Sequence, residues 1–330
     1  MKTFKIGILI ILVAVVGFVV WYNASQKSDA PTTSKPLILG LNPWIGNGIY
    51  HIAKEKRFFN TEGVNVELQD YADGAVGKQL ISSGKVDMLS LTPETVAILK
   101  DAGIDIKAVA FTDTSEGGDG IVATQNIKTV ADLKGKKVAY EEGSPSHFFL
   151  SFLLDKQGMS TKDLQSVNVI APDAGASFVS GNVDAAVTWQ PWLSKASDRQ
   201  GGHLITDSKE NPILPALVIF RTQTVNERPQ DIRAMLRAVF KAREWALANP
   251  NEANAIMAKA FGISVQDVKD QMPDFRWFSY QDNQSGFTSG AYSATNLIQS
   301  AGDLWLKLGL IKTKINASQL VDTSILKNLQ

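Results

Sequence analysis

The most constraining feature of this sequence is a short segment that occurs twice. Ser83–Pro93 reads SGKVDMLSLTP, and Ser180–Pro191 reads SGNVDAAVTWQP. Each copy is typical of a helix closed by glycine, a buried strand entered through Val-Asp, and a loop that reaches proline. Repeat solenoids have units of about 20–50 residues, so two copies roughly 97 residues apart do not fit them. We interpret the segment as one supersecondary unit used once in each of two similar α/β lobes; the alternative is chance similarity.

The order of the remaining elements favours the same interpretation. Apolar runs and helical periodicity alternate along the chain. The expected strands are 37–41, 64–68, 86–91, 106–111, 120–124, 137–140, 167–170, 183–188 and 217–220, and the expected helices include 75–82, 94–102, 146–157, 174–180 and 231–248. This alternation predicts mostly parallel sheets covered by helices, with a ligand cleft at the carboxyl ends of the strands.

The predicted domain limits follow from this order. Residues 1–36 are a signal anchor and tether, 37–123 the first part of lobe 1, 124–217 lobe 2, and 218–330 the second, helical part of lobe 1. The chain then crosses between the lobes twice, near 122–124 and 217–221. Two crossings of this kind make a two-strand hinge.

The N-terminus carries an export signal. Ile6–Tyr22 is almost continuously apolar, is preceded by Lys2 and Lys5, and ends in Trp21-Tyr22. This pattern predicts a short transmembrane helix with an interfacial aromatic end, so that residues 6–22 anchor the chain to the membrane. A cleaved signal peptide is the alternative. Either alternative places the folded part on the extracytoplasmic face of the cytoplasmic membrane, or in the periplasm.

Composition excludes several classes of function. The 33 Lys and Arg residues balance the 33 Asp and Glu residues, which disfavours nucleic acid as a partner. The chain has no Cys, which excludes disulfides, thiolate nucleophiles and Cys-ligated zinc. Its three histidines lie in unrelated contexts, and no hydrolase, zincin or Walker A motif occurs. We therefore expect no catalytic site, no metal and no cofactor.

Two strand-to-helix corners supply candidate ligand contacts. Trp44 lies in the turn 42–48 before a helix, where a large aromatic side chain is suited to stacking on a ligand; packing beneath the loop is the alternative. The second corner is 142–147, where Ser144 suits the N-cap and Pro145 the first helical position. Its polar candidates are Glu142, Ser144, Ser146 and His147, with a purely structural histidine as the alternative.

Six further candidate residues lie at the ends of three expected strands. Asp113 and Thr114 open an acidic, glycine-rich loop, expected to lie at the edge of the cleft or simply in solvent. Thr92 follows the first copy of the repeated strand, and Thr188, Trp189 and Gln190 end the second, so they would face one another across a cleft. Asp87 and Asp184 occupy the same place in both copies and are expected to have a structural role.

Several of these motifs together resemble a known family. They are GLNPWIG at 40–46, IAKEKRFF at 52–59, ADLKGKKV at 131–138, GSPSH at 143–147 and VDAAVTWQPW at 183–192. In this order they are similar to the substrate-binding proteins of ABC importers for nitrate, sulfonate, taurine and bicarbonate. The resemblance covers about 37–310 and implies a two-lobed type II periplasmic binding protein that delivers a small solute to a permease and ATPase. It also implies ligand contacts at Asn42, Trp44, Thr92, Ser144, Ser146 and Trp189.

Two other functions stay open at this stage. The same cleft would serve a ligand-sensing ectodomain. The second is an enzyme of thiamine pyrimidine precursor synthesis, because the superfamily that this chain resembles also contains such an enzyme. That enzyme branch has a cysteine-rich motif, and this chain has no Cys.

The ligand class is less clear than the family. An oxyanion-binding site is usually formed by Arg, Lys or converging helix N-termini. Only Arg57 and Arg199 occur between 37 and 220, and the candidate loops carry carboxylates instead. A zwitterionic or cationic nitrogen compound, held by a carboxylate and a tryptophan, is therefore expected over a bare oxyanion.

Overall fold

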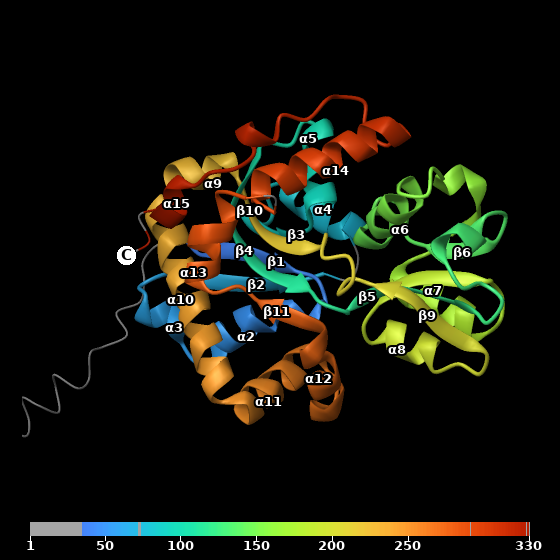
Figure 1. Ribbon diagram of the computed structural model, residues 1–330. Coiled ribbons are helices and arrows are strands. Elements are labelled where there is room, and N and C mark those ends of the chain that lie inside the picture. Colours follow the sequence, from blue (N-terminus) through green and yellow to red (C-terminus); the bar gives the residue numbers. More distant parts are fainter. Residues whose placement is uncertain (1–34, 72–73, 291, 328, 330) are drawn as a thin grey trace, which may run out of the picture. The chain divides into compact units, whose positions relative to one another are not determined.

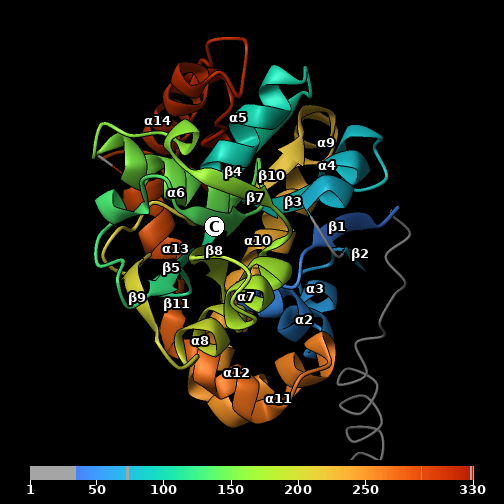
Figure 2. The same cartoon turned by 90° about the vertical axis from the view of Figure 1, so that its right-hand side faces the viewer.

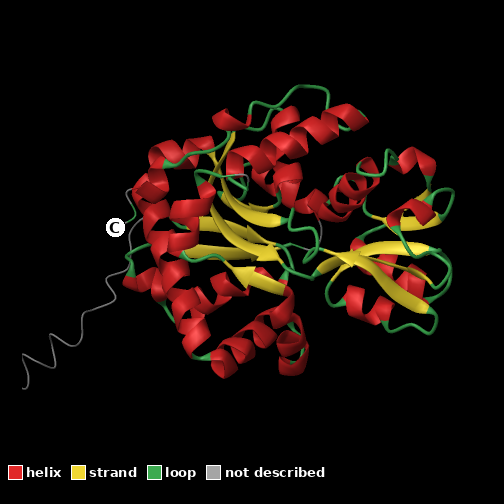
Figure 3. Ribbon diagram, viewed as in Figure 1, coloured by secondary structure: helices red, strands yellow, loops and turns green. Residues whose placement is uncertain are grey.

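The computed structural model describes residues 35–71, 74–290, 292–327 and 329. Pro36–Gln330 forms one compact unit that contains two β-sheets (Figure 1; Figure 3). The predicted membrane segment Ile6–Tyr22 lies outside the described residues. Among the helices that are described, none has the length and hydropathy needed to cross a membrane.

The larger sheet has six strands. In spatial order they are β11 (Phe275–Trp277), β4 (Ile106–Ser115), β10 (Pro215–Arg221), β3 (Met88–Leu91), β1 (Leu37–Leu41) and β2 (Val66–Asp70). β1 pairs in parallel with β2 and β3, whereas β10 pairs antiparallel with β3 and β4, and β11 pairs antiparallel with β4.

The smaller sheet has five strands. In spatial order they are β7 (Gln165–Asn168), β6 (Lys137–Tyr140), β8 (Ala185–Trp189), β5 (Asp119–Thr124) and β9 (Gly202–Asp207). β6 is parallel to β7 and β8, and β5 is antiparallel to β8 and β9. Both sheets are therefore mixed, and the prediction of mostly parallel sheets is corrected. The antiparallel pairs involve strands that enter from the other sheet or from the C-terminal region, so no crossover helix returns them in parallel.

Helices surround both sheets. Those after strands of the larger sheet are α2 (Gly48–Glu55), α3 (Phe58–Thr61), α4 (Gly74–Ser82), α5 (Pro93–Asp101), α9 (Thr222–Glu227), α10 (Pro229–Ala248), α11 (Pro250–Phe261), α12 (Val265–Gln271), α13 (Tyr280–Asp282), α14 (Ala294–Leu308) and α15 (Ser324–Lys327). Those of the smaller sheet are α6 (Pro145–Asp155), α7 (Ala171–Val179) and α8 (Trp192–Ser197). Short turns of other helix types are η1 (Ile45–Asn47), η2 (Val130–Leu133), η3 (Thr161–Asp163), η4 (Met272–Asp274), η5 (Asn283–Phe287) and η6 (Ala317–Gln319).

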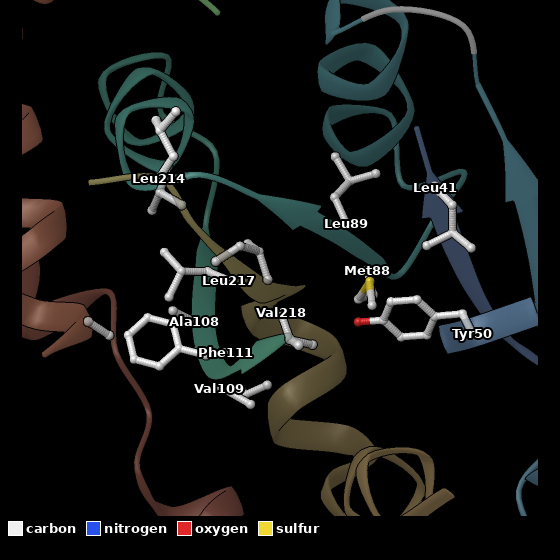
Figure 4. Packing of buried hydrophobic residues seen from close by; sticks show 14 of the residues in the cluster. Leu41, Tyr50, Met88, Leu89, Ala108, Val109, Phe111, Leu214, Leu217 and Val218 are labelled. Carbon is white, nitrogen blue, oxygen red and sulfur yellow. The ribbon is translucent and has the colours of Figure 1, made fainter. Parts of the chain in front are cut away.

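The alternation of side chains along the strands builds the core. In the smaller sheet, Val122 and Ala186 join a cluster with Phe178 of α7, whereas Ile121 and Val187 belong to the main cluster that contains α6. Because successive side chains of a strand point to opposite faces, α6 covers one face of this sheet and α7 with α8 the other (Figure 2). In the larger sheet, buried side chains of β1, β3, β4, β10 and α2 share one cluster (Figure 4).

The chain changes sheets between Ser115 and Asp119, and again between Asp207 and Pro215. The sequence placed these crossings near 122–124 and 217–221. The difference arises because β4 runs on through the polar residues 112–115, which are buried where β10 and β11 pair with it. The lobe limits 37–123, 124–217 and 218–330 stay a prediction.

Candidate functional site

A cavity of about 340 Å³ lies where strands of both sheets end. Residues from β3, β4 and β10 line it from the larger sheet, and Asp119 of β5 and Trp189 of β8 line it from the smaller one. The turn after β1 and the first residues of α6 also reach it. A site at the ends of strands from two neighbouring sheets is where α/β folds commonly bind small molecules.

The predicted residues divide into two groups. Six line the cavity: Asn42, Trp44, Thr92, Asp113, Ser144 and Trp189. The other six are not among its lining residues: Thr114, Glu142, Ser146, His147, Thr188 and Gln190.

Trp44 occupies the centre of the aromatic contacts. Its ring meets the edge of Trp189 from the other sheet at a centroid distance of 6.3 Å, and that of Phe275 at 6.2 Å. Its indole Nε1 donates a hydrogen bond of 2.7 Å to Asp113 Oδ1. The indole is thus fixed by contacts on several sides while its ring still lines the cavity.

Two glycines make room for this arrangement. A Cβ atom at Gly46 would lie 2.5 Å from Trp44 Nε1 and 2.6 Å from Asp113 Cγ. At Gly118, between β4 and β5, a Cβ atom would lie 2.7 Å from Trp44 Cη2. Any larger residue at either position would displace the indole, which explains glycine in both loops.

Asp113 is buried at the end of β4. Its side chain is 1% exposed, Oδ1 accepts from Trp44, and Oδ2 has no hydrogen-bond partner among the described residues. Burial, with a smaller contribution from the nearby charge of Asp119, raises the pKa of Asp113 to about 7. The hydrogen bond from Trp44 opposes this rise. The carboxyl group therefore titrates near neutrality.

Asp119 begins β5 and lines the same cavity. Burial raises its pKa to about 7, a hydrogen bond from Ser115 opposes this, and the charge of Glu94 adds to it. Sequence reasoning counted Asp119 only as one acidic residue of its loop. It missed that β5 returns Asp119 to the Asp113 end of the cavity, because that proximity depends on the crossing between the sheets.

The corner before α6 is built as the sequence predicted, although Ser146 and His147 are buried and do not line the cavity. Ser144 Oγ donates to Glu141 O at 2.6 Å and accepts from His147 N, which makes Ser144 the N-cap. His147 Nδ1 accepts from Gly143 N at 3.1 Å, and its ring packs between Tyr140 and Trp305. Burial lowers the pKa of His147 to about 4, so the imidazole is neutral at pH 7.

The other residues outside the cavity have structural partners or face elsewhere. Thr188 is fully buried and donates to Ala171 O at 2.7 Å. Gln190 bridges the sheets by donating to Asp274 Oδ2 at 2.8 Å and accepting from Ser194 N. Successive side chains of β4 point to opposite faces of the sheet, so Asp113 and Ser115 line the cavity and Thr114 does not.

The two remaining residues differ in exposure. Glu142 is exposed to solvent on the corner, and Ser146 is 2% exposed in the first turn of α6. Neither side chain is among those that line the cavity.

The apolar end of the cavity was not predicted. Phe261, which ends α11, and Ile263, which lies between α11 and α12, line this end together with Ile170, Pro172 and Trp192. Trp192 belongs to a motif of the resemblance, but nothing in the local pattern marks Phe261 or Ile263 as part of a site. Their role depends on the fold of the C-terminal helices against the larger sheet.

Charge at the cavity is mainly acidic. Of the charged side chains that line it within the described chain, Asp113, Asp119 and Glu141 are carboxylates and Lys78 is the one base. Lys78 Nζ donates to Gly143 O at 3.4 Å. Burial raises the pKa of Glu94, and the charge of Lys78 is one of the smaller effects that oppose this rise. No group of three or more potential metal-ligating side chains occurs in the described part of the chain.

Comparison with known proteins supports the resemblance seen in the sequence. The family model described as NMT1/THI5 like matches residues 47–253. A protein of Bacillus subtilis (strain 168) named "Putative aliphatic sulfonates-binding protein" is 28% identical over 326 residues, which cover 97% of this chain and 95% of that protein. This relative carries the name of a binding protein, in agreement with the expectation of a binding protein and not an enzyme.

Solved structures show the same fold. The periplasmic aliphatic sulphonate binding protein SsuA from Escherichia coli superposes with a TM-score of 0.74 at 23% identity, covering 88% of this chain and 93% of that one. The alkanesulfonate-binding protein SsuA from Xanthomonas axonopodis pv. citri, bound to MOPS, gives 0.73 at 18% identity, covering 88% and 100%. The chain therefore has the periplasmic binding protein fold and belongs to the NMT1/THI5-like family.

Proposed function

We propose that this protein is the extracytoplasmic solute-binding component of an ABC importer, and that it binds a small organic solute in the cavity between its two sheets. The observation that carries the proposal is the contact of Trp44 with Trp189 across this cavity, since each comes from a different sheet. A ligand that touches both would hold the two sheets together. Such closure is the usual way in which two-lobed binding proteins signal that they are loaded.

The names of the relatives support a solute that contains sulfur or nitrogen. Sulfonate-binding proteins are among them, and one structural neighbour holds MOPS, an organic sulfonate far larger than nitrate. A cavity of about 340 Å³ falls within the size range of sites for small organic molecules. We infer that the solute is organic, and that a permease and an ATPase in the membrane receive it.

The proposed contacts are the six predicted residues that line the cavity. Trp44 and Trp189 would stack on the solute, and Asn42, Thr92, Asp113 and Ser144 would offer hydrogen bonds.

A thermal-shift screen of the full chain in a mild detergent tests the binding role. Candidates are sulfonates, taurine, nitrate, bicarbonate, guanidine and pyrimidines. A true ligand at 100 times its Kd adds about 2.7 kcal/mol to the free energy of unfolding and should quench or enhance tryptophan fluorescence. If no candidate stabilises the chain, or if Trp44→Ala and Trp189→Ala both leave binding unchanged, the proposed site is wrong.

Copurification separates transport from sensing. A binding component should be retained with the permease and ATPase when the three are produced together, whereas a sensing ectodomain should not. Retention that depends on the ligand would support transport most directly.

A further inference from the structure

The structure leaves one strong acceptor unsatisfied at the cavity. Asp113 is 1% exposed, lines the cavity, and uses Oδ1 to accept from Trp44. Its Oδ2 atom has no hydrogen-bond partner among the described residues. A buried carboxylate oxygen without a donor is costly, and this cost disappears when a ligand supplies the donor.

When Asp113 is ionised, the missing group is a donor, because an ionised carboxylate only accepts hydrogen bonds. Ser90 adds a second unsatisfied atom: the residue lines the cavity, and its buried Oγ has no partner within the described chain. Ser90 can accept or donate, so it fits a nitrogen donor as well. Asp113 is the more selective group of the two.

The surrounding charges favour a positively charged donor. Asp119 lies close enough to raise the pKa of Asp113, and Glu141 also lines the cavity. Lys78, the base that lines the described cavity, donates to Gly143 O and acts on Glu94. An oxyanion at this place would meet the carboxyl groups of Asp113 and Asp119, and no arginine is among the described residues that line the cavity. A protonated nitrogen would instead pair with both carboxyl groups.

Helix N-termini also approach the cavity, and they favour anions. The N-terminus of α5 already holds the buried carboxylate of Glu94, which accepts hydrogen bonds from Thr92 and Thr95. The N-terminus of α6 is capped in part by Ser144 and lies beside Lys78. An anionic group could therefore be placed at the α6 end, beside Lys78.

The remaining wall suits a hydrocarbon or aromatic body. Trp189, Trp192, Phe261 and Ile263 line the cavity together with Ile170. Aromatic faces beside carboxylates are typical of sites for organic cations, which combine ion pairing with cation–π contact.

We propose that the solute carries a protonated nitrogen, which donates to Asp113 and Asp119 while its apolar body lies against Trp189, Trp192 and Ile263. This inference rests on the proposed function and deepens it by naming the charge of the group that is bound. A further acidic group on the solute, if present, would lie near Lys78 and the start of α6.

Proton linkage follows from this geometry. Asp113 and Asp119 both have their pKa raised to about 7 without ligand, and a bound cation would lower both values again. The charge of Glu94 also acts on Asp119, and the charge of Asp113 acts in turn on Tyr50; Glu141 and Lys78 line the same cavity. A cation should therefore bind more tightly as the pH rises from 6 to 8 and should release protons at pH 6.5, whereas an oxyanion should bind more weakly and take protons up.

The test uses two probes with the same phenyl body and opposite charge, benzamidinium and benzenesulfonate, with the full chain in a mild detergent. Calorimetry at pH 6.5 in two buffers of different ionisation enthalpy measures the protons released or taken up. We expect benzamidinium to bind with proton release, and Asp113→Asn to weaken it at least tenfold at pH 8. Asp303→Asn, which changes an exposed carboxylate of α14 outside the cavity, is the matched control and should bind as the unmodified chain does.

Each outcome decides something. Binding of benzenesulfonate with proton uptake, and none of benzamidinium, overturns the charge inference while it leaves the proposed solute-binding function intact. Binding of neither probe also overturns the charge inference, and the broader ligand screen then judges the function separately. If Asp113→Asn does not fold, the benzamidinium affinity of Asp119→Asn and the proton release of the unmodified chain still test the charge inference.

Discussion

β3 and β8 begin in the same way. The residue before each strand is an aspartate that accepts a backbone hydrogen bond from the neighbouring parallel strand: Asp87 from Ile38 N and Asp184 from Lys137 N, both at 2.9 Å. A glycine at positive φ precedes each aspartate, Gly84 at 72° and Gly181 at 76°. Similar local sequences have therefore built the same corner in two sheets.

The two corners differ in the number of segments that the aspartate side chain connects. Asp87 also accepts from Arg221 at 2.9 Å and from Thr224 at 3.1 Å, and so joins β3 to the strand and helix that return from the smaller sheet. Among the described residues, the side chain of Asp184 accepts one hydrogen bond, from Lys137 N. Asp87 thus connects segments that are far apart in sequence, whereas Asp184 connects neighbouring strands within one sheet.

The two strands end differently, and the cavity lies at these ends. Thr92 follows β3 and donates to Glu94 at the start of α5 while it lines the cavity. In β8, Thr188 turns away to bond Ala171, and Trp189 lines the cavity instead. The shared beginning serves the framework, and the divergent end supplies the proposed contacts.

Asp87→Ala should have the largest effect on this comparison. It removes three hydrogen bonds and leaves the partly buried Arg221 without its partner, so we expect a loss of about 3 kcal/mol in the free energy of unfolding. Urea denaturation measures it. A loss below about 1 kcal/mol would show that Asp87 is no more important than Asp184.

Trp189→Ala should act on binding more than on stability. Loss of the indole at the cavity should weaken a ligand found in the screen by about 2 kcal/mol, or roughly thirtyfold. Trp245→Ala is the control, because this half-buried tryptophan lies outside the cavity beneath Lys56. Equal effects of both variants on affinity would remove Trp189 from the proposed site.

Thr188→Val tests whether the inward turn of Thr188 is structural. The valine keeps the volume but leaves Ala171 O without this donor, so we expect a loss of about 1.5 kcal/mol in the free energy of unfolding and unchanged ligand affinity. Thr92→Val removes the donor to Glu94, so we expect it to lower stability as well, but it should also weaken ligand binding, because Thr92 lines the cavity. Thermal unfolding with and without ligand distinguishes the two patterns; weakened binding in Thr188→Val would contradict the assignment.

Asp184→Ala should have the smallest effect. It removes a single hydrogen bond at a half-exposed position, which predicts a loss of about 1 kcal/mol. Hydrogen exchange at the Lys137 amide reports the change locally. Unchanged exchange there would mean that this bond does not hold the corner together.

Much of the framework could be predicted because its signals are local. The strand 37–41 was predicted with the bounds that β1 has, and 137–140 with those of β6. The structural role expected for Asp87 and Asp184 is confirmed, since both accept from backbone amides. A glycine-closed helix followed by Val-Asp and an apolar run specifies its own conformation, whatever lies around it.

Tertiary structure alone decided three other features: the strands β9 and β11, and the place of Asp113 and Thr114 within a strand. β9 and β11 were missed, and β11 both extends β4 and supplies Phe275 beside Trp44. Asp113 and Thr114 belong to a strand where a loop was expected, because pairing with β10 and β11 buries polar residues that local pattern assigns to solvent.

The repeated segment by itself indicated that the same strand corner occurs twice, and where the framework aspartates of the two corners lie. It did not determine the cavity, which needs Asp113 from one sheet, Asp119 from the other and Ile263 from the C-terminal helices. These residues are brought together by strand crossings and helix packing over long separations in sequence. Periodicity and turn chemistry act over a few residues, so they specify the elements, whereas burial of apolar surface between distant elements decides which side chains meet.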